Sequence, residues 1–207
     1  MDVTIIGTGS MGRGLATRVL AGGHSLTLLG HTVANAEALA AQLDGDVSTG
    51  QSGDPLAGDV VVLAVWYQAV DDVIATYGDQ LDGKVVVDIT NPVDPQTYAP
   101  VAVDEGSVAQ HIAARRPHAK VVKAFNTTFA GTLVDGEVAG QPLDVFLAGD
   151  DETAKETVKQ IASDGGLRPI DVGPLALAHH VEALGYLNMA IQPTLGTNYA
   201  SAIKVIA

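Results

Sequence analysis

The sequence predicts an α/β protein with a doubly wound, mostly parallel sheet that is covered by helices on both faces. Short apolar runs of strand length alternate with segments of helical periodicity along almost the whole chain. The connections between these segments are short, as they are in successive strand–helix–strand units. With 47% hydrophobic and 17% charged residues among 207, the chain has enough apolar side chains for a sizeable core.

Apolar runs rich in β-branched residues predict the strands. The clearest run, residues 60–65, is apolar on both faces, as central parallel strands are. The predicted strands span residues 3–6, 26–29, 60–65, 84–89, 121–125, 145–147 and 170–172. Residues 44–58 are rich in glycine and aspartate, which predicts a loop with at most a short edge strand at Val47.

Apolar residues that recur three and four positions apart predict the helices. The first helix begins near Met11 and ends at Gly22, and a later one begins at Asp151 with acids in its first turn. The predicted helices span residues 11–21, 33–43, 68–77, 108–115, 151–162 and 175–191. The tail, residues 197–207, ends in an apolar stretch that we expect to pair at a sheet edge.

The charge balance excludes several classes of function. With 24 acidic and 11 basic residues, the net charge is −13, and such a surface repels nucleic acid and anionic lipid. The absence of cysteine excludes disulfides, thiolate metal sites and thiol nucleophiles. The chain shows no basic leader and no apolar run of the roughly 20 residues that a membrane span needs. We therefore expect a soluble, cytoplasmic protein that acts on a small molecule.

A glycine-rich motif follows the first predicted strand and opens the first helix. It reads Gly7-Thr8-Gly9-Ser10-Met11-Gly12, and this context is typical of dinucleotide binding. Gly7 permits a tight turn, Gly9 lets a diphosphate approach the backbone, and Gly12 lets helix and strand pack closely. The N–H groups at the helix start then face the phosphates. The alternative is a strand–helix turn with a structural role only.

The end of the second predicted strand favours NADP over NAD. NAD sites usually place Asp or Glu there to accept hydrogen bonds from the ribose hydroxyls. This chain has His31 and Thr32 instead, and its first acid afterwards is Glu37. Thr8, His31 and Thr32 can each donate a hydrogen bond to a 2′-phosphate. The alternative for His31 is a solvated loop residue.

Polar or aromatic residues follow three further predicted strands. Because the carboxyl ends of parallel strands meet at one edge, these residues predict the wall of a reaction crevice. They are Val65-Trp66-Tyr67, Asn91-Pro92 and Asn126. Trp66 and Tyr67 suit the wall of a flat ring, and the two asparagines suit a carboxamide or the edge of a flavin-like ring. The alternative is that the asparagines only form turns.

No general acid or base is evident, so the catalytic residues stay unassigned. His179, His180 and Glu182 suggest a metal or proton-transfer cluster, but adjacent helical residues point to different sides. We expect solvated or core-edge histidines and no metal. Lys123 is either a structural lysine or an anion contact. Hydride transfer between two cofactor rings depends on proximity and orientation more than on proton transfer.

Five segments, taken in order, carry a resemblance to a known family. They are residues 7–16 (GTGSMGRGLA), 86–92 (VVDITNP), 122–127 (VKAFNT), 147–151 (LAGDD) and 166–169 (GLRP), and residues 181–184 (VEAL) resemble the family's last helix. In these segments the chain resembles the NADP oxidoreductases that depend on coenzyme F420, and the related cytosolic domain of the six-transmembrane metalloreductases.

The resemblance implies a Rossmann, NAD(P)-binding domain with a small C-terminal helical extension, usually in a homodimer. It also implies NADP(H) binding, with the 2′-phosphate near Thr8 and the end of the second strand, and a hydride passed to a second ring. The chain has His31-Thr32 where the family typically has Ser-Arg. We expect residues 1–173 to form the dinucleotide-binding domain and residues 174–207 to pack on it.

We therefore predict an NADP(H)-dependent oxidoreductase whose second substrate is the deazaflavin coenzyme F420. Two alternatives stay open. One is a flavin or ferric reductase on the same scaffold. The other is a non-catalytic NADP(H) sensor, which the lack of an evident acid–base residue suggests.

Overall fold

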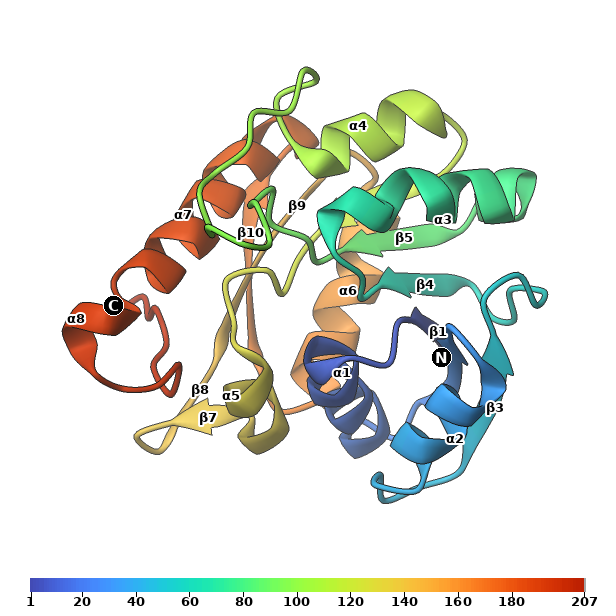
Figure 1. Ribbon diagram of the computed structural model, residues 1–207, viewed down its shortest axis with the longest axis horizontal. Coiled ribbons are helices and arrows are strands. Elements are labelled where there is room, and N and C mark those ends of the chain that lie inside the picture. The colour runs from blue at the N-terminus through green and yellow to red at the C-terminus, as the bar shows by residue number, and fades with distance from the viewer. Residues whose placement is uncertain (207) are drawn as a thin grey trace.

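The computed structural model describes residues 1–206, and its centre is an eight-stranded sheet (Figure 1). The strand order is β10-β9-β6-β5-β4-β1-β2-β3. The strands are β1 (Asp2–Ile6), β2 (Ser25–Gly30), β3 (Val47–Gln51), β4 (Val60–Leu63), β5 (Val85–Asp88), β6 (Lys120–Lys123), β9 (Asp144–Gly149) and β10 (Arg168–Gly173). Six of them follow the 3-2-1-4-5-6 order of dinucleotide-binding folds. Every pair is parallel except β6 with β9, which confirms the mostly parallel sheet.

Helices cover both faces of the sheet. Buried side chains of α1 (Ser10–Ala21), α2 (Val33–Ala40), α5 (Ala130–Asp135) and α6 (Glu152–Asp164) form one apolar cluster. Side chains of α3 (Val70–Tyr77), α4 (Val108–Arg115) and the start of α7 (Ala178–Ala190) form the other. The remaining pieces are short: the 3₁₀ turns η1 (Tyr67–Ala69), η2 (Gly78–Leu81) and η3 (Leu175–Leu177), the hairpin of β7 (Glu137–Val138) and β8 (Gln141–Pro142), and α8 (Gln192–Leu195).

The central strands are buried on both sides, as their continuous apolar character predicts. In β4, Val62 belongs to the first cluster and its neighbours Val61 and Leu63 to the second. This alternation is the two-residue period of a strand. Burying a valine or leucine side chain fully contributes about 1.5–3 kcal/mol to folding stability. Because the strands carry side chains of both clusters, both clusters stabilise the same sheet.

The observed elements differ from the predicted ones at several ends. Strand β3 confirms the edge strand at Val47, whereas α2 ends at Ala40 rather than at residue 43. The last long helix begins at Ala178, because residues 175–177 form the turn η3. Helix α5 and the β7–β8 hairpin are absent from the prediction.

The prediction that the tail pairs as an edge strand is wrong for residues 197–206, which contain no strand. Side-chain contacts hold this segment instead. The Lys204 ammonium lies 2.7 Å from Asp144 Oδ1, and the Val205 N–H donates to Asp144 Oδ2 at 2.8 Å. Arg168 also binds the Asp144 carboxylate and the Val205 carbonyl. The predicted tail's last residue, Ala207, lies outside the described residues. None of the helices within residues 1–206 has the length and apolar character to cross a bilayer.

Candidate functional site

The glycine turn connects β1 to α1 at the carboxyl edge of the sheet. Gly7 has φ +115°, which L side chains rarely adopt, and its N–H donates to the Leu29 carbonyl at 2.9 Å. A Cβ at Gly7 would overlap the carbonyl of Ala64, and one at Gly12 would overlap the carbonyl of Gly7. These two glycines therefore serve the tight turn and the close packing of the helix, as the motif predicts.

Gly9 differs from the other two, because a Cβ built on it meets no atom within 4 Å. It is the N-cap of α1, and it offers no side chain to bind the first N–H groups. By contrast, Thr32, Ser107 and Asp151 cap α2, α4 and α6 with their side chains. The first amides of α1 thus have neither an intrahelical nor a capping partner. Open space above uncapped amides fits a diphosphate, with the helix dipole favouring the negative charge.

The end of β2 adjoins this turn, because Ile6 pairs with Leu29 in the sheet. His31 is exposed there. Thr32 is already engaged: its hydroxyl donates to Asn35 Oδ1 at 2.9 Å and accepts from the Asn35 N–H at 3.3 Å. The predicted contact of Thr32 with a 2′-phosphate therefore competes with a capping box.

The end of β4 carries the aromatic pair of the predicted crevice. Trp66 is 55% exposed, while Val65 and Tyr67 are half-buried. Tyr67 begins the turn η1 that leads into α3. Because the Ala64 carbonyl lies against Gly7, these residues follow the glycine turn along the same edge. An exposed indole at this position is available to a flat ring.

Asn91 and Asn126, which sequence reasoning assigned to the crevice, lie together but bind each other. Asn126 Nδ2 donates to Asn91 Oδ1 and to the Val181 carbonyl, and Asn91 Nδ2 donates to the Asn126 carbonyl, each at 2.9 Å. A Cβ at Gly185 would lie 2.8 Å from Asn91 Oδ1, so α7 approaches the pair closely at that glycine. Asn126 Oδ1 is buried and has no partner within residues 1–206. Beside them, Pro92 is half-buried and its carbonyl accepts from the Val101 N–H.

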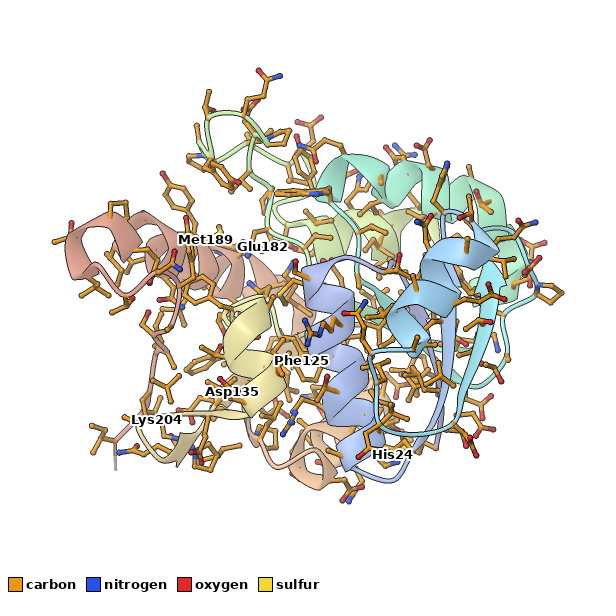
Figure 2. The ribbon with its side chains drawn as sticks, turned by 60° about the horizontal axis from the view of Figure 1, so that its bottom comes forward. His24, Phe125, Asp135, Glu182, Met189 and Lys204 are labelled. Carbon is orange, nitrogen blue, oxygen red and sulfur yellow. The ribbon has the colours of Figure 1, made fainter. Side chains whose placement is uncertain are left out.

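The backbone just before Asn126 is strained. Phe125 has φ +63°, a left-handed conformation that is rare for a bulky residue and costs about 1–3 kcal/mol. Its ring is buried in the cluster with Leu15 and Leu133, and Figure 2 labels it near α1 and α5. Thr128 binds the Phe125 carbonyl at 2.7 Å through its hydroxyl. Core packing and this turn together hold the conformation that aims Asn126 at Asn91.

A buried ionic network joins the two strands that precede the asparagine pair to helix α7. The Lys123 ammonium lies 2.8 Å from Asp88 Oδ2 and 2.7 Å from Glu182 Oε1, and it also binds the Thr90 carbonyl. Glu182 Oε1 accepts from the Val108 N–H at 3.0 Å. Burial raises the pKa of the Glu182 carboxyl, and this effect outweighs the attraction of Lys123. The network therefore joins β5, β6, α4 and α7, and it identifies Lys123 as a structural lysine.

Sequence reasoning missed this network, although a signal was present. Asp88 and Lys123 are opposite charges within apolar runs that predict buried strands, and buried charges are paired. Strands β5 and β6 place the two residues side by side in register. Glu182, which Figure 2 labels on α7, had no comparable signal, because only the docking of α7 brings it to Lys123.

The interpretation of the two histidines is half confirmed. His179 and His180 are both exposed, as expected. The prediction that they point to different sides is wrong, because their ring centroids are 3.7 Å apart. They lie in the first turn of α7, where His179 Nδ1 contacts the Ala176 carbonyl at 2.8 Å and the ring leans back over η3. Among residues 1–206, no group of three or more His, Cys, Asp or Glu residues is suited to a metal ion.

Comparison with known proteins agrees with this architecture. Residues 2–92 match the family described as NADP oxidoreductase, coenzyme F420-dependent. The chain is 30% identical over 202 residues to an F420-dependent NADP reductase of Methanothermobacter thermautotrophicus, covering 89% of this chain and 86% of that protein. It is 32% identical over 182 residues to the metalloreductase STEAP3 of Rattus norvegicus, covering 88% of this chain but 36% of that protein.

A solved structure extends the likeness to the whole fold. The crystal structure of a protein from Arthrobacter sp. FB24, described as a putative F420-dependent NADP reductase, superposes with a TM-score of 0.85 at 28% identity. The match covers 99% of each chain. It therefore includes the C-terminal helical part as well as the strands of the glycine turn. The chain belongs to the family of coenzyme F420-dependent NADP oxidoreductases.

Proposed function

We propose that this chain transfers a hydride between NADP(H) and the deazaflavin ring of coenzyme F420. The observation that carries the proposal is the glycine turn, where the uncapped start of α1 and the open space at Gly9 fit a diphosphate. Membership of the family, and the 30% identity to a protein named F420-dependent NADP reductase, supply the identity of the second ring.

The proposed cofactor site follows the carboxyl edge of the sheet. Residues of the glycine motif, 7–12, hold the diphosphate, and Thr8 with His31 and Thr32 borders the adenosine end. Val65, Trp66 and Tyr67 wall the nicotinamide, while Asn91, Pro92 and Asn126 form its floor. When bound, NADPH supplies the hydride. The protein's residues then act by holding two rings at reacting distance and excluding water, which accounts for a crevice without an evident general acid or base.

The asparagine pair has a positioning role in this proposal. Each amide is fixed by the other and by α7, so the floor of the crevice is rigid before any ligand binds. Rigid groups around a reaction site lose little entropy when the ligand binds. Asn126 Oδ1 is buried, and it is the one amide atom of the pair without a hydrogen-bond partner within residues 1–206.

The activity test mixes the protein with NADPH and oxidised coenzyme F420 in a stopped-flow instrument and follows the deazaflavin absorbance. We expect its loss at a rate that depends on both substrates. The same mixing with FMN, and with a ferric chelate, measures the alternative acceptors. Tight NADPH binding without reduction of any acceptor would contradict the proposal and support a sensor.

The first prediction concerns Gly9→Val. A valine fits there without strain, since φ is −74° and no atom lies within 4 Å of the added Cβ, but its methyl groups occupy the space of the diphosphate. We expect NADPH affinity to fall at least a hundredfold with an unchanged melting temperature, because the dinucleotide loses its main anchoring contacts. Emission of Trp66, the one tryptophan in the sequence, reports binding.

The matched control is Gly131→Val, since a Cβ at Gly131 also meets no atom within 4 Å. It tests whether a valine at any glycine with open space around it lowers the NADPH affinity. Unchanged NADPH affinity in Gly9→Val would overturn the diphosphate assignment.

We further infer that the protein is a homodimer through one face of α7 and α8. Residues 178–195 contain a single charged side chain, Glu182, which is buried. The same segment exposes Leu187, Ile191 and Leu195, at 53%, 36% and 50%. In a chain of net charge −13, an uncharged apolar face is where two acidic copies can meet with least repulsion. Residues 1–173 and the segment from residue 174 then form one unit, joined by the contacts of Val181 and Glu182.

A further inference from the structure

Arg13 is the one basic side chain without a visible role in the fold. Of the 11 lysines and arginines, every other one contacts a carboxylate or a backbone carbonyl. Within residues 1–206, Arg13 has no hydrogen-bond or ion-pair partner, and it is exposed. Arg18 and Lys84 bind carbonyls only, which leaves Arg13 as the one basic side chain with neither a carboxylate nor a carbonyl partner within residues 1–206.

The position of Arg13 on α1 places it at the cofactor end of the helix. It is the fourth residue of α1, counted from Ser10. Side chains of a helix tilt toward its N-terminus, so the guanidinium extends back toward the level of the glycine turn. No acid occupies the first turn of α1 or of α2.

The face of α1 that carries Arg13 looks toward α2, not toward α5. Residues 13, 17 and 20 share one face by helical spacing, and Leu20 at its far end lies 3.1 Å from a Cβ built on Gly45, which follows α2. Gly14 and Arg18, about a third of a turn away around the helix, contact α5. Both views show α1 between α5 and α2 (Figures 1 and 2). Arg13 therefore lies on the side of α1 where β2 ends and α2 begins.

We propose that Arg13 is the cation that binds the 2′-phosphate of NADP(H) and sets the preference over NAD(H). This inference rests on the proposed function and names a specificity residue for it. At the end of β2 the chain has His31, which when neutral donates one hydrogen bond, and Thr32, whose hydroxyl caps α2. Neither supplies a fixed positive charge. A guanidinium does, and its planar donors match the oxygens of a phosphate.

The test uses two fragments that differ by the phosphate in question, 2′,5′-ADP and 5′-AMP, titrated calorimetrically into the full chain. In the wild type we expect 2′,5′-ADP to bind more tightly. Arg13→Gln should lower the affinity for 2′,5′-ADP roughly ten- to hundredfold, the loss of a charge-assisted hydrogen bond, with little change for 5′-AMP. Arg13→Lys should restore part of the difference, because it returns the charge without the planar fork.

The matched control is Arg115→Gln, which removes one positive charge from α4, a helix of the other apolar cluster. The Arg115 side chain is 53% exposed, and its ion pair with Asp71 has an N–O distance of 3.4 Å. Equal losses in Arg13→Gln and Arg115→Gln would overturn the proposal by revealing a general effect of net charge. So would equal losses for the two fragments in Arg13→Gln, which would place Arg13 on another phosphate.

The two proposals fail in different ways. If the wild type binds NADPH and NADH equally, and 2′,5′-ADP no better than 5′-AMP, the role of Arg13 is wrong while dinucleotide binding stands. If the wild type binds no dinucleotide, both are wrong.

Discussion

The buried side chain of Lys123 connects the carboxyl ends of strands β5 and β6 to helix α7. The lysine is fully buried, with Asp88 on one side and Glu182 on the other. Two carboxylates share one ammonium, and burial raises the pKa of Glu182. Removing the cation leaves both acids without their partner in the core, whereas removing one acid leaves a balanced pair.

We therefore predict unequal costs for two substitutions. Lys123→Met should lower the free energy of unfolding by about 3–5 kcal/mol, the range for breaking a buried ion pair by removing one partner. Glu182→Gln should cost less than about 2 kcal/mol, since the amide oxygen still accepts from Lys123 and from the Val108 N–H. Urea unfolding of both variants measures the difference. A larger loss in Glu182→Gln would show that this account of the network is mistaken.

At the scale of elements, one histidine joins two helices and the loop that leads into the second of them. His111 of α4 contacts Asp71 of α3 through Nε2 at 2.8 Å and Glu105 of the preceding loop through Nδ1 at 3.0 Å. Arg115 also faces Asp71, at 3.4 Å. The hydrogen bond that His111 donates to Asp71 is the largest cause that raises the pKa of His111, and hydrogen bonds from His111 lower the pKa of both carboxyls.

The sign of these shifts predicts a stability window. The contribution of His111 is fully present below about pH 6.5, its unfolded value, and is lost as pH rises through the higher folded pKa. The contribution of Asp71 and Glu105 is present above about pH 4 and lost as pH falls through their lower folded values. The stabilisation should therefore be largest between about pH 4.5 and 6.5.

His111→Gln tests this window by thermal unfolding across pH. We expect the difference in melting temperature from the wild type to be largest near pH 6 and to shrink above pH 7. His118→Gln is the control, because His118 is exposed and has no side-chain partner within residues 1–206. A difference that stays constant with pH would refute the ionic role.

The sequence predicted the helices and strands whose hydrophobic pattern extends over several residues. It missed those that are stabilised mainly by tertiary contacts. The apolar run of β4 and the four-residue repeats of α6 are visible in the sequence. Helix α5 has six residues, too few for a pattern, and its packing against Gly14 and Arg18 of α1 stabilises it. Gly136, in the left-handed conformation at its end, was the available signal.

The candidate site was predictable in place but not in its internal contacts. The rule that ligands bind at the carboxyl ends of strands located Trp66, Asn91 and Asn126 at one edge. That the two asparagines bind each other depends on the left-handed turn at Phe125 and on the approach of α7 at Gly185. A local pattern contains neither of these facts.

At the scale of the whole molecule, the uncharged face of α7 and α8 has a consequence for assembly. Leu187→Glu places a carboxylate in the centre of that face, next to its copy in a symmetric dimer, where repulsion and loss of apolar burial act together. In size-exclusion chromatography with light scattering, we expect the variant to be a monomer and the wild type to be a dimer at the same concentration. Ala75→Glu, on the exposed face of helix α3, adds the same charge elsewhere and should leave the dimer intact. A dimer in both variants would exclude this interface.

The reversed direction of β9 determines the edge of the sheet at which Asp150 and Asp151 lie. Because β9 runs antiparallel to β6, its last residues continue toward the start of β6, and the two aspartates that follow lie at the amino edge of strands β1–β6. Asp151 caps α6 and lies 3.4 Å from Lys120, the first residue of β6, while Asp150 accepts from the Leu175 N–H. In a parallel β9, both would lie at the carboxyl edge of the sheet, which carries the glycine turn. The two inverted strands, β9 and β10, thus keep two carboxylates away from the edge where we propose that the negatively charged coenzyme binds.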